Sequence, residues 1–292
     1  MKVIRAAAMG MCFGVRDALE VARGIVEPAE VTIYGELVHN EAVTRELAGR
    51  GFRVLGEAER KSKMPVTPKI MITAHGISKI ERLRMSAAGY ELIDTTCPLV
   101  RRAHEAAREL AAMGCFVLVI GRRGHVEVEG IVGDLKRHEV IESAAEARQY
   151  GEPFIGVLCQ TTTAPAVAGE IIERIRLLNA GSQIHYAPTI CRATMDRQAA
   201  VRSLLARVEA LVVVGGRKSN NTIQLAEMAR GAGKPCALVT SADEVDAGWL
   251  AQFETVGLTA GTSTPDEAIE AVHRRMVEIA RETDSREWRQ AV

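Results

Sequence analysis

The strongest constraint on the fold of this chain is an internal repeat. A cysteine followed by a helical run and then by a strand rich in β-branched residues occurs three times, beginning at Cys12, Cys97 and Cys191. The offset from Cys12 to Cys97 is 85 residues, and the offset between the glycines after the following strands, Gly35 and Gly121, is 86. Between the second and third copies the same offsets are 94 and 95 residues. Self-similarity at a fixed period indicates repeated structural units, so we expect three units of roughly 90 residues each.

Each copy also contains a second strand that ends in small polar residues, within residues 70–78, 155–163 and 256–264. Short β-branched strands such as residues 212–214 alternate with helical stretches of roughly 10 to 15 residues, which is typical of parallel α/β units. In open parallel sheets, ligands bind beyond the carboxyl ends of the strands, where the cysteines and polar turns are expected. We therefore predict an α/β fold in which three similar units form a pseudo-threefold, trilobed arrangement around a shared central site.

The boundaries of these units are expected to follow the cysteines. We expect the first unit over residues 13–96, the second over 97–187 and the third over 188–281, joined by an N-terminal strand within residues 1–12. Residues 282–292 are expected to form a tail. Because no Gly/Ser-rich or Pro-rich linker separates the units, we expect them to associate tightly.

Composition and charge exclude several classes of protein. The chain has 37 Lys and Arg against 37 Asp and Glu, which argues against a general nucleic-acid or anionic-membrane binder. No apolar run approaches the roughly 18 residues that a membrane helix needs. With 47% hydrophobic residues the chain can form a real core. We expect a cytoplasmic protein with reduced thiols that binds any anion through local contacts and binds neither nucleic acid nor membrane.

The three repeat cysteines could hold zinc, an iron–sulfur cluster or no metal. Their wide spacing does not resemble the short spacings of zinc sites. Iron–sulfur clusters are soft-thiolate sites that normally take four cysteines, so three would leave one iron open. Of the other cysteines, Cys115 and Cys236 are expected to be small buried hydrophobic residues, whereas Cys159 adjoins a polar turn and stays undecided.

Nine short motifs occur in order along the chain, at residues 11–15, 35–40, 73–78, 94–100, 124–130, 160–162, 189–191, 214–216 and 259–261. In this order they resemble the IspH/LytB family of 4-hydroxy-3-methylbut-2-enyl diphosphate reductases. The resemblance covers nearly everything from Lys2 to about Val272. One such motif would be weak evidence, whereas nine in the same order are specific.

The resemblance implies a trilobed fold around a central iron–sulfur site, a 4Fe–4S cluster bound by Cys12, Cys97 and Cys191. One open iron would bind the hydroxyl of the substrate. The implied reaction, the last step of the methylerythritol phosphate route to isoprenoids, consumes two electrons and two protons and yields isopentenyl and dimethylallyl diphosphate with loss of water. Reduced ferredoxin or flavodoxin would supply the electrons, and the protein is expected to be a monomer or a homodimer.

The resemblance also assigns residues to an allylic diphosphate substrate, whose burial requires compensating donors. The expected binding residues are His39, His75, His125, Gln160, Ser219, Asn220, Asn221 and Ser263. Glu127 corresponds to the acid with which the family delivers a proton, and Thr161 would hydrogen-bond the hydroxyl that leaves. Glu129 is the alternative carboxylate.

Two departures from the family pattern keep alternatives open. Val126 replaces a proline, and the turn at residues 219–222 reads Ser-Asn-Asn-Thr in place of Ser-Ser-Asn-Ser. The changed turn motivates one alternative, a paralogue that acts on another allylic diphosphate. A non-catalytic iron–sulfur sensor or electron carrier is a second alternative, and a zinc hydrolase is a third.

Overall fold

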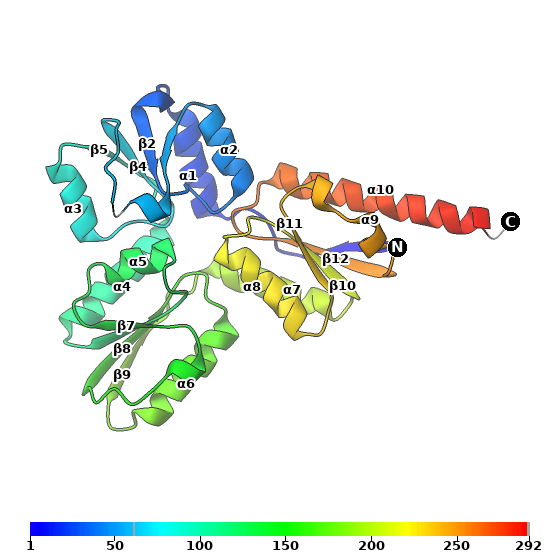
Figure 1. Cartoon of the computed structure of the whole chain (residues 1–292). Coiled ribbons are helices and arrows are strands. Elements are labelled where there is room, and N and C mark those ends of the chain that lie inside the picture. Colours follow the sequence, from blue (N-terminus) through cyan, green and yellow to red (C-terminus); the bar gives the residue numbers. More distant parts are fainter. Residues whose placement is uncertain (61, 291–292) are drawn as a thin grey trace. The chain divides into compact units, whose positions relative to one another are not determined.

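The computed structural model describes residues 1–60 and 62–290, with side chains through Glu282 (Figure 1). By its internal contacts the chain divides into two compact units. Unit 1 comprises Met1–Cys12, His39–Val43 and Arg192–Val292, and unit 2 comprises Phe13–Val38 and Thr44–Cys191. The chain passes between the units at four places, and two of them directly follow Cys12 and Cys191.

Unit 2 contains two four-stranded sheets whose described strand pairs are parallel. The first has the order β3-β2-β4-β5, with β2 Val31–Tyr34, β3 Arg53–Leu55, β4 Lys69–Ile72 and β5 Glu91–Asp94. The second has the order β7-β6-β8-β9, with β6 Phe116–Ile120, β7 His138–Ile141, β8 Phe154–Cys159 and β9 Gln183–Ala187. The helices are α1 Phe13–Gly24, α3 Lys79–Ala87, α4 Pro98–Ala112, α5 Val126–Val132 and α6 Pro165–Leu178, with short 3-10 helices η1 Pro28–Glu30, η2 Glu57–Glu59 and η3 Ala144–Glu146. Helix α2, Glu41–Gly49, begins in unit 1 and ends in unit 2.

Unit 1 contains one parallel sheet of order β1-β12-β10-β11. Its strands are β1 Lys2–Arg5, β10 Ala210–Val214, β11 Cys236–Val239 and β12 Thr255–Ala260. The N-terminal strand, blue in Figure 1, therefore lies beside strands from the far end of the chain, with Val3 opposite Val256. The helices are α7 Arg192–Leu205, α8 Asn220–Gly231, α9 Ala247–Leu250 and α10 Asp266–Gln290, with the 3-10 helix η4 Ala242–Glu244.

The three sheets repeat one topology, which confirms the prediction of an α/β fold built from three similar units. In each sheet the strand after a cysteine-led helix is flanked by a later edge strand and by the strand that ends in polar residues. The edge strands β3, β7 and β11 were not predicted, because they are short, only partly buried and poor in β-branched runs. The finer boundaries at 13–96, 97–187, 188–281 and 1–12 stay a prediction. Helix α10 continues through Gln290, and residues 291–292 of the predicted tail lie outside the described residues.

Strand β10 illustrates why these sheets form. All of it is buried, because helices cover both faces of a parallel sheet. Leu211 and Val213 pack in a core cluster with residues of α7 and α8, whereas Val212 and Val214 pack in another cluster with residues of α10. Side chains of a strand alternate between its two faces, so a continuous apolar run provides apolar side chains to the core on each face of the sheet.

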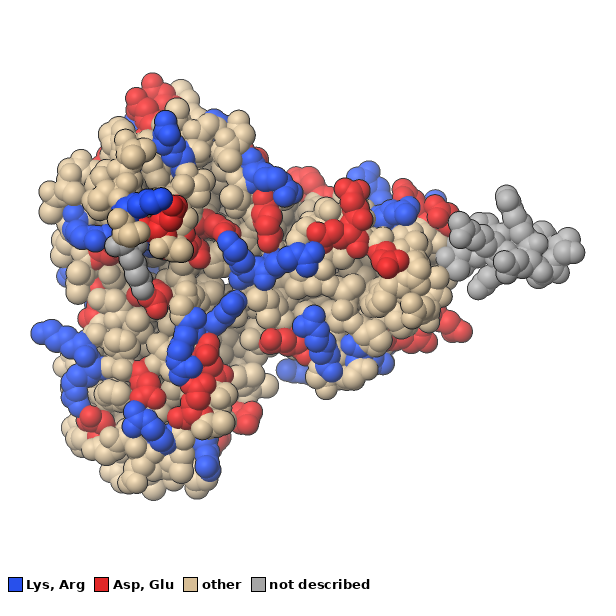
Figure 2. Space-filling view, in the orientation of Figure 1, with Lys and Arg blue, Asp and Glu red and all other residues tan. Residues whose placement is uncertain are grey.

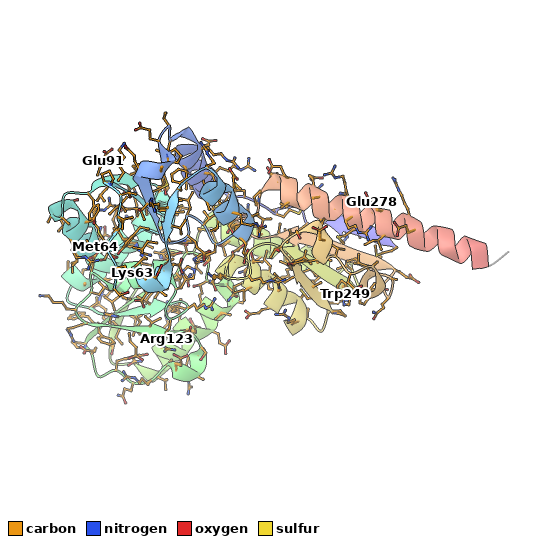
Figure 3. All side chains as sticks on the ribbon, turned by 45° about the horizontal axis from the view of Figure 1, so that its top comes forward. Lys63, Met64, Glu91, Arg123, Trp249 and Glu278 are labelled. Carbon is orange, nitrogen blue, oxygen red and sulfur yellow. The ribbon has the colours of Figure 1, made fainter. Side chains whose placement is uncertain are left out.

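The surface agrees with the balanced composition. Figure 2 shows Lys and Arg interspersed with Asp and Glu on the face in view, without one dominant sign. Lys63 and Met64, labelled in Figure 3, are exposed in the segment that follows η2. Within residues 1–60 and 62–290, no helix is both long enough and apolar enough to cross a membrane.

Arg197 of α7 connects this helix to the N-terminal segment of unit 1 through hydrogen bonds. Its buried guanidinium donates to the carbonyl oxygens of Gly10 (2.9 Å from Nε) and Ala193 (3.0 Å). Arg197→Ala leaves these acceptors without their donor, so we expect the free energy of unfolding to fall by about 2 kcal/mol and the melting temperature by about 5 °C. Thermal unfolding followed by circular dichroism measures this. Arg202→Ala, on the exposed face of the same helix, is the control and should melt like the parent chain.

Candidate functional site

The predicted site residues lie in two groups, one in each unit. The group in unit 2, here named the Glu127 cluster, comprises His75, Cys97, His125, Glu127, Gln160, Thr161 and Cys191. The group in unit 1, here named the Cys12 cluster, comprises Cys12, His39, Ser219, Asn220, Asn221 and Ser263. Most of these residues lie in turns that follow the carboxyl ends of strands, where parallel sheets bind ligands.

Glu127 is held in the first turn of α5. It is 2% exposed, and its backbone N–H donates to Nδ1 of His125, the residue that caps the helix, over 3.1 Å. Because Nδ1 accepts this hydrogen bond, the proton of a neutral His125 resides on Nε2. His125 can therefore donate to a ligand as a neutral imidazole.

Thr161 donates a hydrogen bond to each oxygen of the Glu127 carboxylate. Its backbone N–H donates to Oε1 over 2.6 Å, and its hydroxyl donates to Oε2 over 2.9 Å. Both residues are buried. Because the Thr161 hydroxyl donates its hydrogen to Glu127, its lone pairs can accept a hydrogen bond from a ligand hydroxyl. The pair can thus pass a proton between a buried carboxyl and a ligand through one hydroxyl.

Cys191 is tied to the same turn. Its backbone N–H donates to the carbonyl of Thr161 over 2.9 Å. Just upstream, the hydroxyl of Thr189 contacts the backbone N–H and carbonyl of Cys159 at the end of β8. These bonds fix the segment that carries Cys191 against the strand that carries Thr161.

Gln160 is fully buried and has an orphaned donor. Its Oε1 accepts the backbone N–H of Arg122 over 3.0 Å, whereas its Nε2 has no hydrogen-bond partner in the described part of the chain. A Cβ at Gly121 would lie 2.7 Å from the Cβ of Gln160, so the side chain is confined. Buried N–H groups without a partner are rare in folded proteins, and this one suits an oxygen of a ligand or of water.

Cys97 caps the N-terminus of α4, with Pro98 at the first helical position. Its N–H donates to the carbonyl of Ala74 over 3.1 Å. A Cβ placed at Gly14 of α1 would lie 2.4 Å from the Cys97 sulfur, so only glycine fits there. Gly14 lies in the motif at residues 11–15, but its sequence position alone predicts no role for it.

Two of the three predicted histidines meet within unit 2. The ring centroids of His75 and His125 are 5.5 Å apart, with the rings nearly perpendicular. His75 leads into a turn in which Gly76 adopts a φ of +72°, a conformation that favours glycine. The third histidine, His39, belongs to the Cys12 cluster.

The Cys12 cluster is connected through one polar turn. The N–H of Cys12 donates to the carbonyl of Thr262 (3.0 Å), and the N–H of Thr262 donates to Oδ1 of Asn221 (3.0 Å). The hydroxyl of Ser263 donates to the carbonyl of His39 (3.0 Å). Four predicted site residues are thus joined by hydrogen bonds of a single turn.

The altered turn at residues 219–222 forms the start of α8. Ser219 caps the helix by accepting the N–H of Thr222, and Asn220 and Asn221 lie buried in its first turn. Nδ2 of Asn221 has no partner among the residues described. The side chain of Thr222 packs against the backbone of Gly261, where a Cβ would lie 2.0 Å from its Oγ1. The change at position 222 is therefore accommodated by packing against Gly261.

Position before a helix separates the six cysteines. Cys12, Cys97 and Cys191 are partly exposed, and each directly precedes a helix, whose N-terminal partial charge attracts anionic ligands. Cys236 starts strand β11 and is also partly exposed, so the expectation that it is buried was wrong, whereas Cys115 and Cys159 are buried. Burial raises the pKa of the Cys159 thiol to about 12, that of Cys236 to about 11 and that of Cys115 above its usual value. The first three thus fit a soft-metal ligand set, and the other three fit inert thiols.

His104 is a buried residue of α4 for which the sequence predicts no role. It packs against two glycines that adjoin site residues: a Cβ at Gly76 would lie 3.4 Å from its Nε2, and one at Gly130 would lie 3.0 Å from its Cε1. Burial lowers the pKa of His104 to about 4, Asp134 opposes this change, and Arg108 and Arg82 reinforce it. A neutral imidazole therefore lies between the His75 turn and the helix of Glu127.

Comparison with known sequences identifies close relatives. A family model described as "LytB protein" matches residues 3–277. The chain is 35% identical to a protein of Burkholderia pseudomallei (strain 1026b) named 4-hydroxy-3-methylbut-2-enyl diphosphate reductase, over 93% of this chain and 88% of the relative. A protein of the same name from Corynebacterium glutamicum is 32% identical, over 95% of this chain and 87% of the relative.

Two solved structures have similar folds. The E-1-hydroxy-2-methyl-but-2-enyl-4-diphosphate reductase of Plasmodium falciparum matches with a TM-score of 0.83 at 22% identity, over 94% of this chain and 87% of that one. A structure of (E)-4-hydroxy-3-methyl-but-2-enyl diphosphate reductase, described as the terminal enzyme of the non-mevalonate pathway, matches with a TM-score of 0.63 at 28% identity, over 95% of this chain and 100% of that one.

The neutral state of His104 predicts a pH dependence of stability. Its pKa is about 4 when folded, against about 6.5 when unfolded, so its stabilising contribution is complete above pH 6.5 and is lost as the pH falls toward 4. The loss amounts to roughly 3 kcal/mol. His104→Gln should flatten the fall in melting temperature between pH 6.5 and 4. The half-buried His185, changed to Gln, is the control, and an equal slope in both variants would contradict the assignment.

Proposed function

Because the chain belongs to the LytB protein family, we propose that it reduces 4-hydroxy-3-methylbut-2-enyl diphosphate to isopentenyl and dimethylallyl diphosphate, the last step of the methylerythritol phosphate pathway. The observation that carries the proposal is the match over nearly the whole chain to relatives of that name. In the reaction a C–O bond breaks, the carbon skeleton gains two electrons and one proton, and the hydroxyl leaves as water with a second proton.

We propose that Cys12, Cys97 and Cys191 bind a 4Fe–4S cluster, the cofactor of this family, with one iron left without a protein ligand. Their partial exposure, their places before helices and the close approach of Gly14 to the Cys97 sulfur support this ligand set. When bound, the cluster would supply electrons one at a time. The chain's own residues would bind the substrate and move protons.

The diphosphate would be bound mainly by neutral donors. The proposed binding residues are His39, His75, His125, Gln160, Ser219, Asn220, Asn221 and Ser263. The buried amide nitrogens of Gln160 and Asn221, which lack partners among the described residues, and the start of α8 at Asn220 support this assignment. A zero net charge is compatible with an anionic substrate if the donors are this local.

Protonated Glu127 would donate a proton from Oε2 to the Thr161 oxygen, and the Thr161 hydroxyl would pass its own proton to the departing hydroxyl, so the bond between these two groups would exchange donor and acceptor. The two hydrogen bonds between them fix the carboxyl in one orientation, and the burial of both residues keeps water away from the exchange. Nε2 of His125, two residues before Glu127, would donate to the neighbouring phosphate.

We further propose that a reduced ferredoxin or flavodoxin supplies the electrons, and that the protein works in the cytoplasm as a monomer or a homodimer. Both donors transfer single electrons, which matches a cluster that accepts them one at a time.

The function is tested by anaerobic purification, followed by measurement of iron, sulfide and turnover with dithionite and methyl viologen as reductant. The proposal expects about four iron atoms per chain, consumption of the substrate and a change in the electron paramagnetic resonance spectrum on its addition. A cluster-loaded protein that consumes no substrate would favour the sensor or carrier alternative. A protein that binds zinc without sulfide would favour the hydrolase.

Gly14→Ala tests the cluster site. The added methyl group would lie 2.4 Å from the Cys97 sulfur, so the sulfur must move and we expect most of the bound iron and sulfide to be lost. Gly24→Ala is a matched control in the same helix, because a Cβ there has no neighbour within 4 Å. Iron content after identical anaerobic reconstitution is the measurement. Equal loading of both variants would argue against Cys97 as a ligand.

Glu127→Gln tests the proton donor. The amide keeps the size of the side chain but cannot supply the proton, so we expect turnover to fall by about 100-fold or more while the cluster content and the substrate-induced spectrum persist. Glu129→Gln, on the exposed face of the same helix, is the control and should retain turnover. If Glu129→Gln lost the activity and Glu127→Gln kept it, the roles would be exchanged.

A further inference from the structure

A shallow cleft of about 280 Å³ in unit 2 is not used by the proposed reaction. It lies between α3 and α4, two helices of the cyan to green part of Figure 1. Its charged walls carry four cations and two carboxylates: Lys79, Arg82, Arg101, Arg108, Asp94 and Glu105. Asp134, which does not line the cleft, lies 3.5 Å from Arg108, so four cations face three carboxylates and one positive charge remains in excess.

The cleft wall includes the segment that carries Cys97. Asp94 ends β5, and its Oδ1 accepts both the N–H (3.0 Å) and the hydroxyl (2.6 Å) of Thr96, the residue before Cys97. On the other side, the N–H of Arg101 donates to the carbonyl of Cys97 over 3.0 Å. Two lining residues, Thr96 and Arg101, thus contact or adjoin the backbone of a proposed cluster ligand.

The cations of this cleft are incompletely neutralised. Arg82 and Arg101 share one oxygen, Oδ2 of Asp94, at 2.7 and 3.0 Å, and their side chains are 35% and 52% exposed. One carboxylate cannot neutralise two guanidinium groups. Exposed ion pairs also exchange partners at little cost in free energy. Both guanidinium groups therefore keep donors for carboxylates of another molecule.

An exposed apolar side chain accompanies these charges. Leu83, one helical turn after Lys79 in α3, is 58% exposed, whereas Ile80 lines a separate pocket with Glu81 and Gly130. Apolar residues beside charges of one sign are typical of surfaces that bind another protein, where charge complementarity speeds encounter. A site for a small anion would not need the exposed apolar side chain.

We propose that this cleft, with the adjoining face of α3, is the docking surface for an acidic one-electron carrier protein. The inference rests on the proposed function, because that reaction consumes two electrons from outside the chain. The rate of electron transfer falls steeply with distance. A carrier therefore transfers electrons fastest when it docks where a turn that carries a cluster ligand reaches the surface. The cleft provides such a place directly beside the Cys97 turn.

The test uses a double variant, Lys79→Gln with Arg101→Gln, and a matched control, Arg53→Gln with Arg174→Gln. Each double variant removes two exposed positive charges from unit 2, and the control positions do not line the cleft.

Turnover of the cluster-loaded chains is measured with a reduced acidic 2Fe–2S ferredoxin and, separately, with dithionite and methyl viologen. We expect the cleft variant to lose about tenfold in kcat/KM for ferredoxin at low salt, with the deficit shrinking as salt is added. Turnover with the chemical reductant should match the control.

Two results would overturn the proposal. Equal ferredoxin-driven rates in the cleft variant and the control would remove the docking role. Equal losses with both reductants would mean that the cleft acts on the reacting site and not on the carrier. Failure of the proposed function itself is distinguished by the parent chain, which would then be inactive with the chemical reductant as well.

Discussion

The candidate site depends on how a chain leaves a parallel strand. Where a strand ends and the next helix begins, some peptide groups lack hydrogen-bond partners within their own element. Capping groups must provide these partners. His125 does this before α5 and Ser219 does it before α8. The same junction recurs in all three sheets, which places polar residues beyond the same end of each. The residues proposed for chemistry are therefore also residues that the fold needs at those positions.

Backbone hydrogen bonds link these junctions to one another. Thr161 holds Glu127 through its amide and hydroxyl and holds Cys191 through its carbonyl, so the acid and one proposed ligand share a support. In unit 1, Thr262 plays the corresponding part between Cys12 and Asn221. Groups oriented by backbone bonds are fixed before a ligand arrives, which reduces the reorganisation that binding and reaction require.

Local pattern predicts the units, the cysteine ligand candidates and the polar turns, because each depends on residues close together in sequence. Gly14 and His104 lack such a signal. The first is constrained by the Cys97 sulfur and the second by Gly76 and Gly130, all of which come close only through the tertiary fold. The contact of Arg197 with the N-terminal segment joins residues 187 positions apart. Roles that arise from such long-range packing cannot be read from the spacing of motifs.

The pairing of β1 with β12 also bears on the order of folding. Strand β1 is synthesised long before β10, β11 and β12, the other members of its sheet, so that sheet cannot close until residues 255–260 have been synthesised. Both sheets of unit 2 lie earlier in the chain and have no such requirement. Long-range pairing of this kind is slow because a large loop must close first. Cys12, whose N–H bonds to Thr262, therefore reaches its native surroundings later than Cys97 and Cys191, and a cofactor that all three bind would be loaded late in the biogenesis of the protein.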